Sequence, residues 1–164
     1  MKFPPTLVQS HYLSPLGPMI LAASGAGLAG VWFEDQRHLP DTSAWAQAKA
    51  NSVLRQTATQ LSEYFAGKRQ HFDLPLDLGS GTAFQQSVWS ALLGIAYGAH
   101  SSYGVLSAAI GKPTAVRAVG GAVGRNPLTI VVPCHRVLGA QGALTGYAGG
   151  LERKVKLLEL ESQA

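Results

Sequence analysis

A change of residue pattern near residues 74–82 divides this 164-residue chain into two parts. The stretch HFDLPLDLGSGT, residues 71–82, combines Pro75 with two glycines and follows neither a helical nor a strand pattern. We therefore expect an N-terminal domain over residues 1–74, a linker over residues 75–81 and a C-terminal domain over residues 82–164. The chain is long enough for one ordinary domain, or for two small ones that share a core.

The first part carries strand patterns followed by a helical one. The runs TLVQSHYL (6–13), PMILAAS (18–24) and LAGVWF (28–33), with the turn-like GAG before the last, predict a three-stranded antiparallel sheet. Residues 43–66 place apolar side chains at partly helical spacing, and Gly67 ends that run. We expect a small α/β domain in which this helix packs on the sheet.

The second part predicts short helices, which gives an α+β chain overall. Thr82 is a suitable N-cap for a helix with Phe84, Val88, Leu92 and Ile95 on one stripe. Helices expected over 103–110 and 114–123 flank the connection GKP and form a candidate winged helix-turn-helix, whose second helix would enter a DNA groove. Plain helix packing gives the same pattern, so this motif alone leaves both interpretations open. The amphipathic segment LERKVKLLELE, residues 151–161, predicts a last helix.

The net charge of +4 lies entirely in the second part of the chain. Residues 1–81 hold six basic and six acidic side chains, whereas residues 82–164 hold seven and three. No Asp or Glu occurs between Thr82 and Leu151, where the cations are Lys112, Arg117, Arg125 and Arg136. This distribution suits a polyanion such as DNA, because each missing carboxylate removes a repulsion with phosphate. A weakly charged core rich in Gly and Ala would look the same.

Cys134 is the only cysteine, which excludes an intrachain disulfide and a zinc site built from several cysteines. The start MKFPPTLVQS lacks the features of a signal peptide, and no apolar run approaches the roughly 20 residues that span a bilayer. These features predict a cytoplasmic protein without a structural metal.

A lone cysteine is most often an inert packing residue, but the neighbours of Cys134 favour chemistry. Pro133 ends the apolar run TIVV, which we expect to be a strand, so the thiol lies where an element stops. The adjacent His135 could take the thiol proton, directly or through a water, and leave the reactive thiolate. An acid would then orient the imidazole, and the acids downstream are Glu152, Glu159 and Glu161. Spacing alone does not choose among them.

Several motifs together resemble the O6-alkylguanine-DNA alkyltransferases, also called methylated-DNA–protein-cysteine methyltransferases. PCHRV (133–137) is preceded by RNP (125–127) and followed by GYAGGLERK (146–154). The resemblance continues upstream through KPTAVRAVGGAVGRNP (112–127), SYG (102–104) and GTAFQQSVW (81–89). It covers residues 75–161 closely, and the N-terminal part more loosely through QLSEYFAGKR (60–69).

The resemblance implies DNA repair by direct reversal of damage. A member of this family binds duplex DNA through the minor groove with a helix-turn-helix and flips out the damaged base. It then transfers the alkyl group of O6-alkylguanine, or more weakly of O4-alkylthymine, irreversibly to its own cysteine. The reaction needs no cofactor, and each protein molecule acts once. We expect a monomer, and whether several copies bind DNA cooperatively stays an open question.

The resemblance also implies roles for the residues around the thiol. Cys134 would be the nucleophile and alkyl acceptor, and His135 its base through a water. Glu161 aligns with the glutamate that orients the histidine, with Glu159 as the local alternative. Asn126 would hold the turn before the active-site segment by hydrogen bonds from its side chain to the backbone.

A second set of residues would contact the DNA and the flipped base. Tyr103 would crowd a phosphate and donate a hydrogen bond to the base, and Arg117 would fill the vacated stack. Ala115 would allow close approach of the helix, and Arg136 would add positive charge. Tyr147 would form the mobile wall of the base pocket, with backbone groups near Val137 and Ala148 reading guanine edges.

Two other classes of protein remain as alternatives. A cysteine hydrolase would need an oxyanion hole and would turn over repeatedly. A DNA-binding regulator without catalytic activity would bind the lesion and leave it intact.

Overall fold

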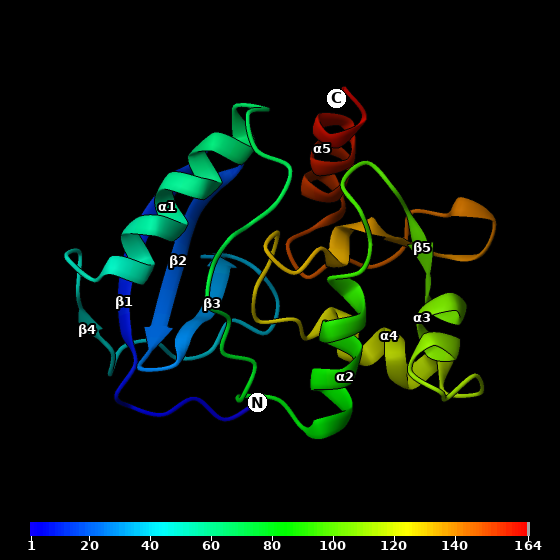
Figure 1. The fold of residues 1–164 in the computed structure, drawn as a ribbon, viewed down its shortest axis with the longest axis horizontal. Helices are drawn as coiled ribbons and strands as arrows, with labels where there is room; N and C mark the ends of the chain where they lie inside the picture. Colours follow the sequence, from blue (N-terminus) through cyan, green and yellow to red (C-terminus); the bar gives the residue numbers. More distant parts are fainter. Residues whose placement is uncertain (164) are drawn as a thin grey trace.

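Three antiparallel strands form the sheet of the N-terminal half in the computed structural model, which describes residues 1–163 (Figure 1). They are β1 (Val8–Ser14), β2 (Gly17–Ser24) and β3 (Gly27–Phe33), which match the three strands that the sequence predicted. A two-residue strand, β4 (Ala46–Gln47), adds to β1 in parallel and gives the order β3-β2-β1-β4. The sequence pattern missed β4 because two residues are too short to show a period.

The predicted helix over residues 43–66 is shorter than expected. The helix α1 spans Ser52–Phe65 and begins at Asn51, whose side chain accepts a hydrogen bond from the backbone N–H of Leu54. Trp45 belongs to the other side of the sheet, where its ring lies 5.9 Å from that of Trp32. The expectation of a helix from residue 43 is therefore wrong, because Trp45 packs away from α1.

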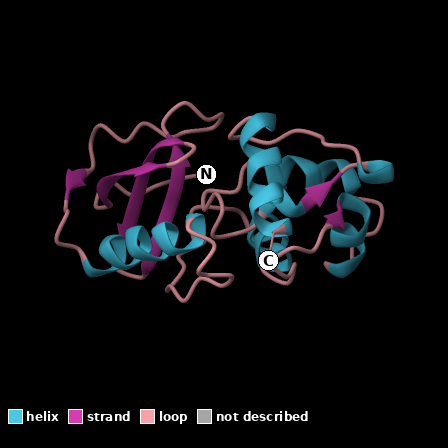
Figure 2. Cartoon of the chain, turned by 90° about the horizontal axis from the view of Figure 1, so that it is seen from above, coloured by secondary structure: helices cyan, strands magenta, loops and turns pink. Residues whose placement is uncertain are grey.

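Both faces of the sheet are covered, because successive side chains of a strand point in opposite directions. On β2, Met19, Leu21 and Ala23 join the main core with Leu54, Leu61 and Tyr64 of α1. Ile20 and Ala22 face a smaller aromatic cluster that includes Trp32 and Trp45. Figure 2 shows α1 along one face of the sheet, with the helices of the C-terminal half grouped beside it.

The C-terminal half contains the short helices that the sequence predicted. They are α2 (Ala83–Leu92), α3 (Tyr103–Ala109), α4 (Val116–Gly124) and α5 (Leu151–Ser162). Thr82 and Gln85 form a reciprocal capping box at the start of α2. Ile95 lies beyond the end of α2, although its side chain is buried. Between the helices, β5 (Ser101–Ser102) pairs in parallel with β6 (Val137–Leu138).

The free edge of β3 joins the two halves of the chain. Leu28 donates its N–H to the carbonyl of Pro75 (2.7 Å), and Val31 donates to the carbonyl of Pro127 (2.8 Å). The pairing shifts from Ala22 with Gly30 to Ala23 with Leu28, so Ala29 is the extra residue of a bulge. This bulge lets Leu28 and Val31, three positions apart, direct their polar groups to the same edge. The segment predicted as a linker is thus bound to the sheet at Pro75 and Asp77.

The run TIVV, predicted as a strand, forms a tight loop instead. Val132 donates its N–H to the carbonyl of Leu128, and Ile130 has a φ of 74°. A β-branched residue rarely adopts this left-handed conformation, so the surrounding contacts must impose it. Attachment of Leu128 and Thr129 to Val31 supplies such a constraint and brings the loop back toward residue 134.

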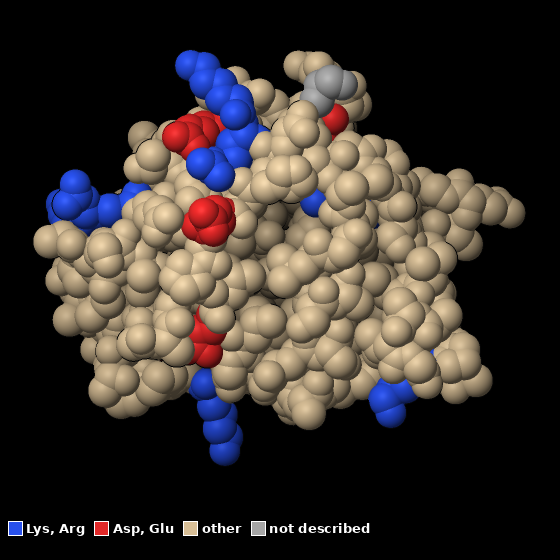
Figure 3. Space-filling model, in the orientation of Figure 1, with Lys and Arg blue, Asp and Glu red and all other residues tan. Residues whose placement is uncertain are grey.

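Acidic side chains are unevenly distributed over the surface. Figure 3 shows them over the N-terminal half and near the end of α5, while the surface over α2 and α3 shows none of the described acids in this view. Within residues 1–163, no helix combines the length and the apolar character needed to cross a membrane.

Candidate active site

Cys134 opens a short 3-10 turn, η1 (Cys134–Arg136), directly after Pro133, and its side chain is buried. Asn126 donates from Nδ2 to the thiol sulfur (3.2 Å) and to the carbonyl of Val132 (2.8 Å). Its Oδ1 accepts a hydrogen bond from the backbone N–H of Leu128 (2.9 Å). Asn126 therefore holds the turn by side-chain to backbone bonds, as expected, and also contacts the sulfur, which was not foreseen.

Burial raises the pKa of the Cys134 thiol, and the hydrogen bond from Asn126 and the positive charge of Lys154 oppose this rise. The net direction is upward, so the resting thiol keeps its proton. Formation of a thiolate here requires a base.

His135 is buried next to Cys134, and its Nε2 lies 2.7 Å from Oε1 of Glu161. A carboxylate only accepts hydrogen bonds, so Nε2 carries the proton and Nδ1 keeps a lone pair. Nδ1 has no hydrogen-bond partner among residues 1–163. Burial lowers the pKa of His135 although Glu161 opposes the shift, so the ring is neutral and can accept a proton at Nδ1. We call Cys134, His135 and Glu161 the relay.

Glu161 stays ionised although it is buried. Burial by itself would raise the pKa of this carboxyl, but hydrogen bonds from His135 and Arg136 outweigh it and hold the pKa well below its usual range. Arg136 donates from Nε to Oε2 (2.8 Å) and from Nη2 to Oε1 (2.9 Å). The guanidinium neutralises the carboxylate that aligns His135.

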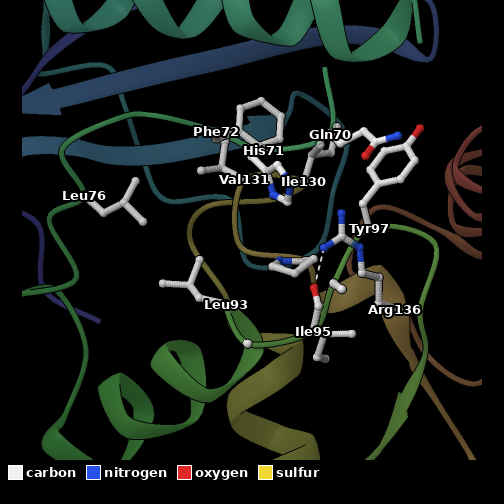
Figure 4. A pocket seen from close by; sticks show the side chains of 13 residues that line it. Gln70, His71, Phe72, Leu76, Leu93, Ile95, Tyr97, Ile130, Val131 and Arg136 are labelled. Carbon is white, nitrogen blue, oxygen red and sulfur yellow. Dashed lines mark hydrogen bonds between the residues drawn. The ribbon is translucent and has the colours of Figure 1, made fainter. Parts of the chain in front are cut away.

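The prediction that Arg136 contacts DNA is wrong for its side chain. Its guanidinium is buried against Glu161, and Nη1 donates to the carbonyl of Ile95 at 2.6 Å (Figure 4). Tyr97 lies over the same group, with the guanidinium carbon 5.7 Å from the ring centre. The sequence showed only a cation in an acid-free stretch, whereas its partner lies 25 positions further on.

The position of each residue on α5 decides between the two candidate acids. Lys154, Leu157 and Glu161 follow one another at helical spacing and are buried on one side of α5. Glu159 is exposed. The structure therefore brings His135 together with Glu161 and not with Glu159.

Several of the predicted base-contacting residues surround one hollow of about 140 Å³. Tyr103, the first residue of α3, faces Tyr147 and Ala148 there, and Arg37 and His38 from the N-terminal half complete the wall. The hydroxyl of Tyr103 lies 3.3 Å from Oγ1 of Thr145. The buried hydroxyl of Tyr147 has no hydrogen-bond partner within residues 1–163.

The other predicted contacts are not among the residues that line this hollow. Ala115 is half-buried at the N-terminus of α4, and Arg117 is exposed one residue inside that helix. Val137 is buried, and its carbonyl accepts a hydrogen bond from Nζ of Lys154 (2.6 Å). The contacts of these residues with DNA stay predictions. Residues 1–163 contain no group of three or more His, Cys, Asp or Glu side chains that could hold a metal ion.

Comparison with known proteins shows that both halves of the chain match domains of one protein family. Residues 7–78 match the ribonuclease-like domain of 6-O-methylguanine DNA methyltransferase, and residues 83–163 match the DNA-binding domain of the same protein family. The chain belongs to this family. A relative from Mycobacterium leprae, named methylated-DNA–protein-cysteine methyltransferase, is 50% identical over 148 residues, which are 90% of this chain and 88% of the relative. One of the same name from Haemophilus influenzae is 42% identical over 156 residues, or 94% and 86% of the two chains.

Solved structures of the 6-O-methylguanine DNA methyltransferase family have the same fold. The O6-methylguanine methyltransferase of Mycobacterium tuberculosis superimposes with a TM-score of 0.87 at 46% identity, covering 96% of this chain and 94% of that one. The structure of that organism's OGT in complex with DNA gives a TM-score of 0.84 at the same identity, with 96% and 93% covered.

Two buried residues of this family member were missed by the sequence analysis. Lys154 donates from Nζ to the carbonyls of Val137 and Thr145 and so ties β6 to the loop before Tyr147. Tyr64 of α1 donates its hydroxyl to Glu161 (2.7 Å). The periodicity of α5 could have placed Lys154 on the inner side, but nothing in the sequence links Tyr64 with a residue 97 positions away.

Proposed function

We propose that this chain repairs alkylated DNA by transferring the alkyl group of O6-alkylguanine, and more weakly of O4-alkylthymine, to Cys134. Membership of the methyltransferase family supports methyl transfer from DNA to a protein cysteine. The observation that carries the role of Cys134 is its buried thiol, held by Asn126 beside the His135–Glu161 pair. The chain contains no other thiol that could accept the group.

The relay prepares the nucleophile. The thiol proton passes through a water to Nδ1 of His135, and the ionised Glu161 stabilises the imidazolium that forms. The hydrogen bond from Asn126 and the charge of Lys154 favour the resulting thiolate. His135 therefore offsets the resistance to ionisation that burial gives to Cys134.

The transfer is a displacement at the alkyl carbon. A bond forms between sulfur and that carbon while the bond from carbon to O6 breaks, and its electron pair goes to guanine. The phenol of Tyr103 donates a proton to the base, so guanine leaves neutral. The phenolate then recovers a proton through the solvent, and the imidazolium of His135 releases the former thiol proton to it. Because the thioether product is stable, each molecule acts once.

In the DNA complex that we propose, the exposed side of the C-terminal half faces the duplex. The protein binds duplex DNA as a monomer, and helices α3 and α4 contact the minor groove. Ala115 allows close approach of the helix, and Arg117 fills the gap that the flipped base leaves in the base stack. The flipped base enters the hollow beside Tyr103 and Tyr147, near the backbone of Val137 and Ala148. Stoichiometric repair without a cofactor fits the cytoplasmic location that we predict.

One experiment separates this function from the two alternatives. The protein is mixed with a duplex oligonucleotide that carries one O6-methylguanine, and its intact mass is measured. We expect a gain of one methylene that stops at one equivalent and does not occur in Cys134→Ser or with unmodified duplex. A hydrolase would turn over with unchanged mass, and a non-catalytic DNA-binding protein would leave the lesion intact.

A further inference from the structure

A polar side chain of the N-terminal half contacts the relay. The hydroxyl of Tyr64, near the end of α1, donates a hydrogen bond of 2.7 Å to Oε1 of Glu161, and both groups are buried. Other contacts between the halves lie outside the relay: Val31 pairs through its backbone, and Arg153 forms an ion pair with Asp35. The contact of Tyr64 reaches the relay itself.

Tyr64 and His135 share a single acceptor atom. Oε1 of Glu161 accepts from the Tyr64 hydroxyl (2.7 Å), from Nε2 of His135 (2.7 Å) and from Nη2 of Arg136 (2.9 Å). Burial and the negative charge of Glu161 raise the pKa of Tyr64 well above its ordinary value, so its phenol keeps its proton and acts as a donor. Each donor to Oε1 disperses negative charge that would otherwise stabilise a protonated His135.

Packing from both halves holds the Tyr64 ring in place. The ring is fully buried, with Phe72 at 5.5 Å and Tyr97 at 6.1 Å between ring centres. Tyr97 also lies over the guanidinium of Arg136. Because these rings fill the space around the phenol, its hydroxyl is directed at Glu161.

We propose that Tyr64 is a positioning residue of alkyl transfer: its hydroxyl orients the Glu161 carboxylate and limits how strongly that carboxylate favours protonation of His135. This inference rests on the proposed function. It assigns the N-terminal half a part in the chemistry, since Glu161 of the relay has this donor only when Tyr64 of α1 lies beside α5.

The electrostatic part of this inference has a definite sign. Without the Tyr64 hydroxyl, Oε1 of Glu161 carries more uncompensated charge, so the pKa of His135 rises. The acid limb of the pH–rate profile, where protonation of His135 stops the reaction, then moves to higher pH. Removal of this hydroxyl leaves in place the other titratable and charged groups that surround His135 and Glu161. They are Cys134, Arg136, Lys154, Tyr97 and Tyr147.

The test compares Tyr64→Phe with Tyr12→Phe. Tyr12 also contacts α1 through its hydroxyl, at 3.1 Å from Oγ of Ser62, but this contact is exposed and does not reach Glu161. Rates of methyl transfer from the O6-methylguanine duplex are measured by intact mass across the pH range. For Tyr64→Phe we expect about a tenfold slower transfer, as for the loss of one hydrogen bond to a charged group, and an acid limb at higher pH. Tyr12→Phe should match the unsubstituted protein in both.

A second variant separates positioning from packing. Site-specific 3,5-difluorotyrosine at position 64 keeps the ring and makes its hydroxyl a stronger donor, so the acid limb should move to lower pH. If the acid limb of the pH–rate profile stays at the same pH in both variants, the proposal is overturned, whatever the rates of methyl transfer. Tyr64 would then be a packing residue. Absence of methyl transfer in the unsubstituted protein would instead refute the proposed function.

Discussion

The relay and the exposed side of α3 and α4 use polar residues in opposite ways. In the relay, Glu161 accepts hydrogen bonds from Tyr64, His135 and Arg136 while nearly excluded from solvent. On the exposed side, Arg117 faces solvent at the start of α4. Removal of a buried partner leaves other buried groups unpaired, whereas water replaces an exposed one. Substitutions in the relay should therefore affect both stability and chemistry, whereas substitutions of exposed side chains on α4 should affect only the repair of DNA.

The largest effect is expected for Glu161→Gln. The buried Arg136 would lose the charge that it pairs with, at a cost of about 3–5 kcal/mol in the free energy of unfolding. Urea unfolding measures this cost, and methyl transfer should fall with it because His135 loses its aligning charge. Glu159→Gln, on the exposed side of the same helix, is the control and should stay within about 0.5 kcal/mol. Equal stability of the two variants would contradict the contrast between buried and exposed groups.

The same ion pair predicts how stability depends on pH. The pKa of Glu161 is lowered in the folded state, so its contribution is complete above its unfolded pKa of about 4.3 and is lost as the pH falls toward the folded value. The stability difference between the unsubstituted protein and Glu161→Gln should therefore narrow as the pH falls from about 5 to 3. Thermal melts across this range measure it, and a constant difference would show that Glu161 is not ionised.

A smaller effect on stability is expected for Asn126→Ala. The backbone N–H of Leu128 would lose its acceptor and the carbonyl of Val132 a donor, at about 1–3 kcal/mol. Loss of the donor to the sulfur should also raise the pKa of Cys134 and slow methyl transfer. Asn126→Asp keeps an acceptor for Leu128 but sets a negative charge beside the sulfur. It should recover stability relative to the alanine variant while transfer remains slow, and recovery of both would argue against the contact with sulfur.

The smallest effect is expected for Arg117→Ala, which should leave the free energy of unfolding unchanged within about 0.5 kcal/mol. Repair of duplex DNA should slow by roughly fivefold, from loss of about 1 kcal/mol of stacking on neighbouring bases. The rate of reaction with the free base O6-methylguanine should not change, because a free base leaves no gap in a duplex for Arg117 to fill. A parallel loss with the free base would place Arg117 in the chemistry and not in DNA binding.

Local patterns predicted most of the elements. Alternation in TLVQSHYL, the apolar run PMILAAS and the turn before LAGVWF located β1, β2 and β3, and Thr82 was predicted as the N-cap of α2. The wrong predictions of secondary structure concern segments in which long-range packing overrides local preference. Trp45 joins an aromatic cluster across the sheet, and the TIVV run folds into a loop because its neighbours pair with Val31.

The partners of buried charges were the least predictable part of the site. Arg136 looked like a DNA contact because its stretch contains no acid, yet it pairs with Glu161. Lys154 and Tyr64 were missed because their acceptors belong to other segments of the chain. A sequence reveals which groups are charged, but only burial decides which of them must be paired.

The sequence by itself determined that one thiol is available, that a histidine follows it, and that acids are absent between Thr82 and Leu151. These properties depend on residue identity and order alone. The tertiary structure decided that Glu161 rather than Glu159 meets His135, that Arg136 turns inward, and that Tyr64 reaches the same carboxylate from the other half. Hydrogen bonds act over about 3 Å, so residues far apart in sequence become partners only after folding brings them within this distance, as it does for Tyr64 of α1 and Glu161 of α5.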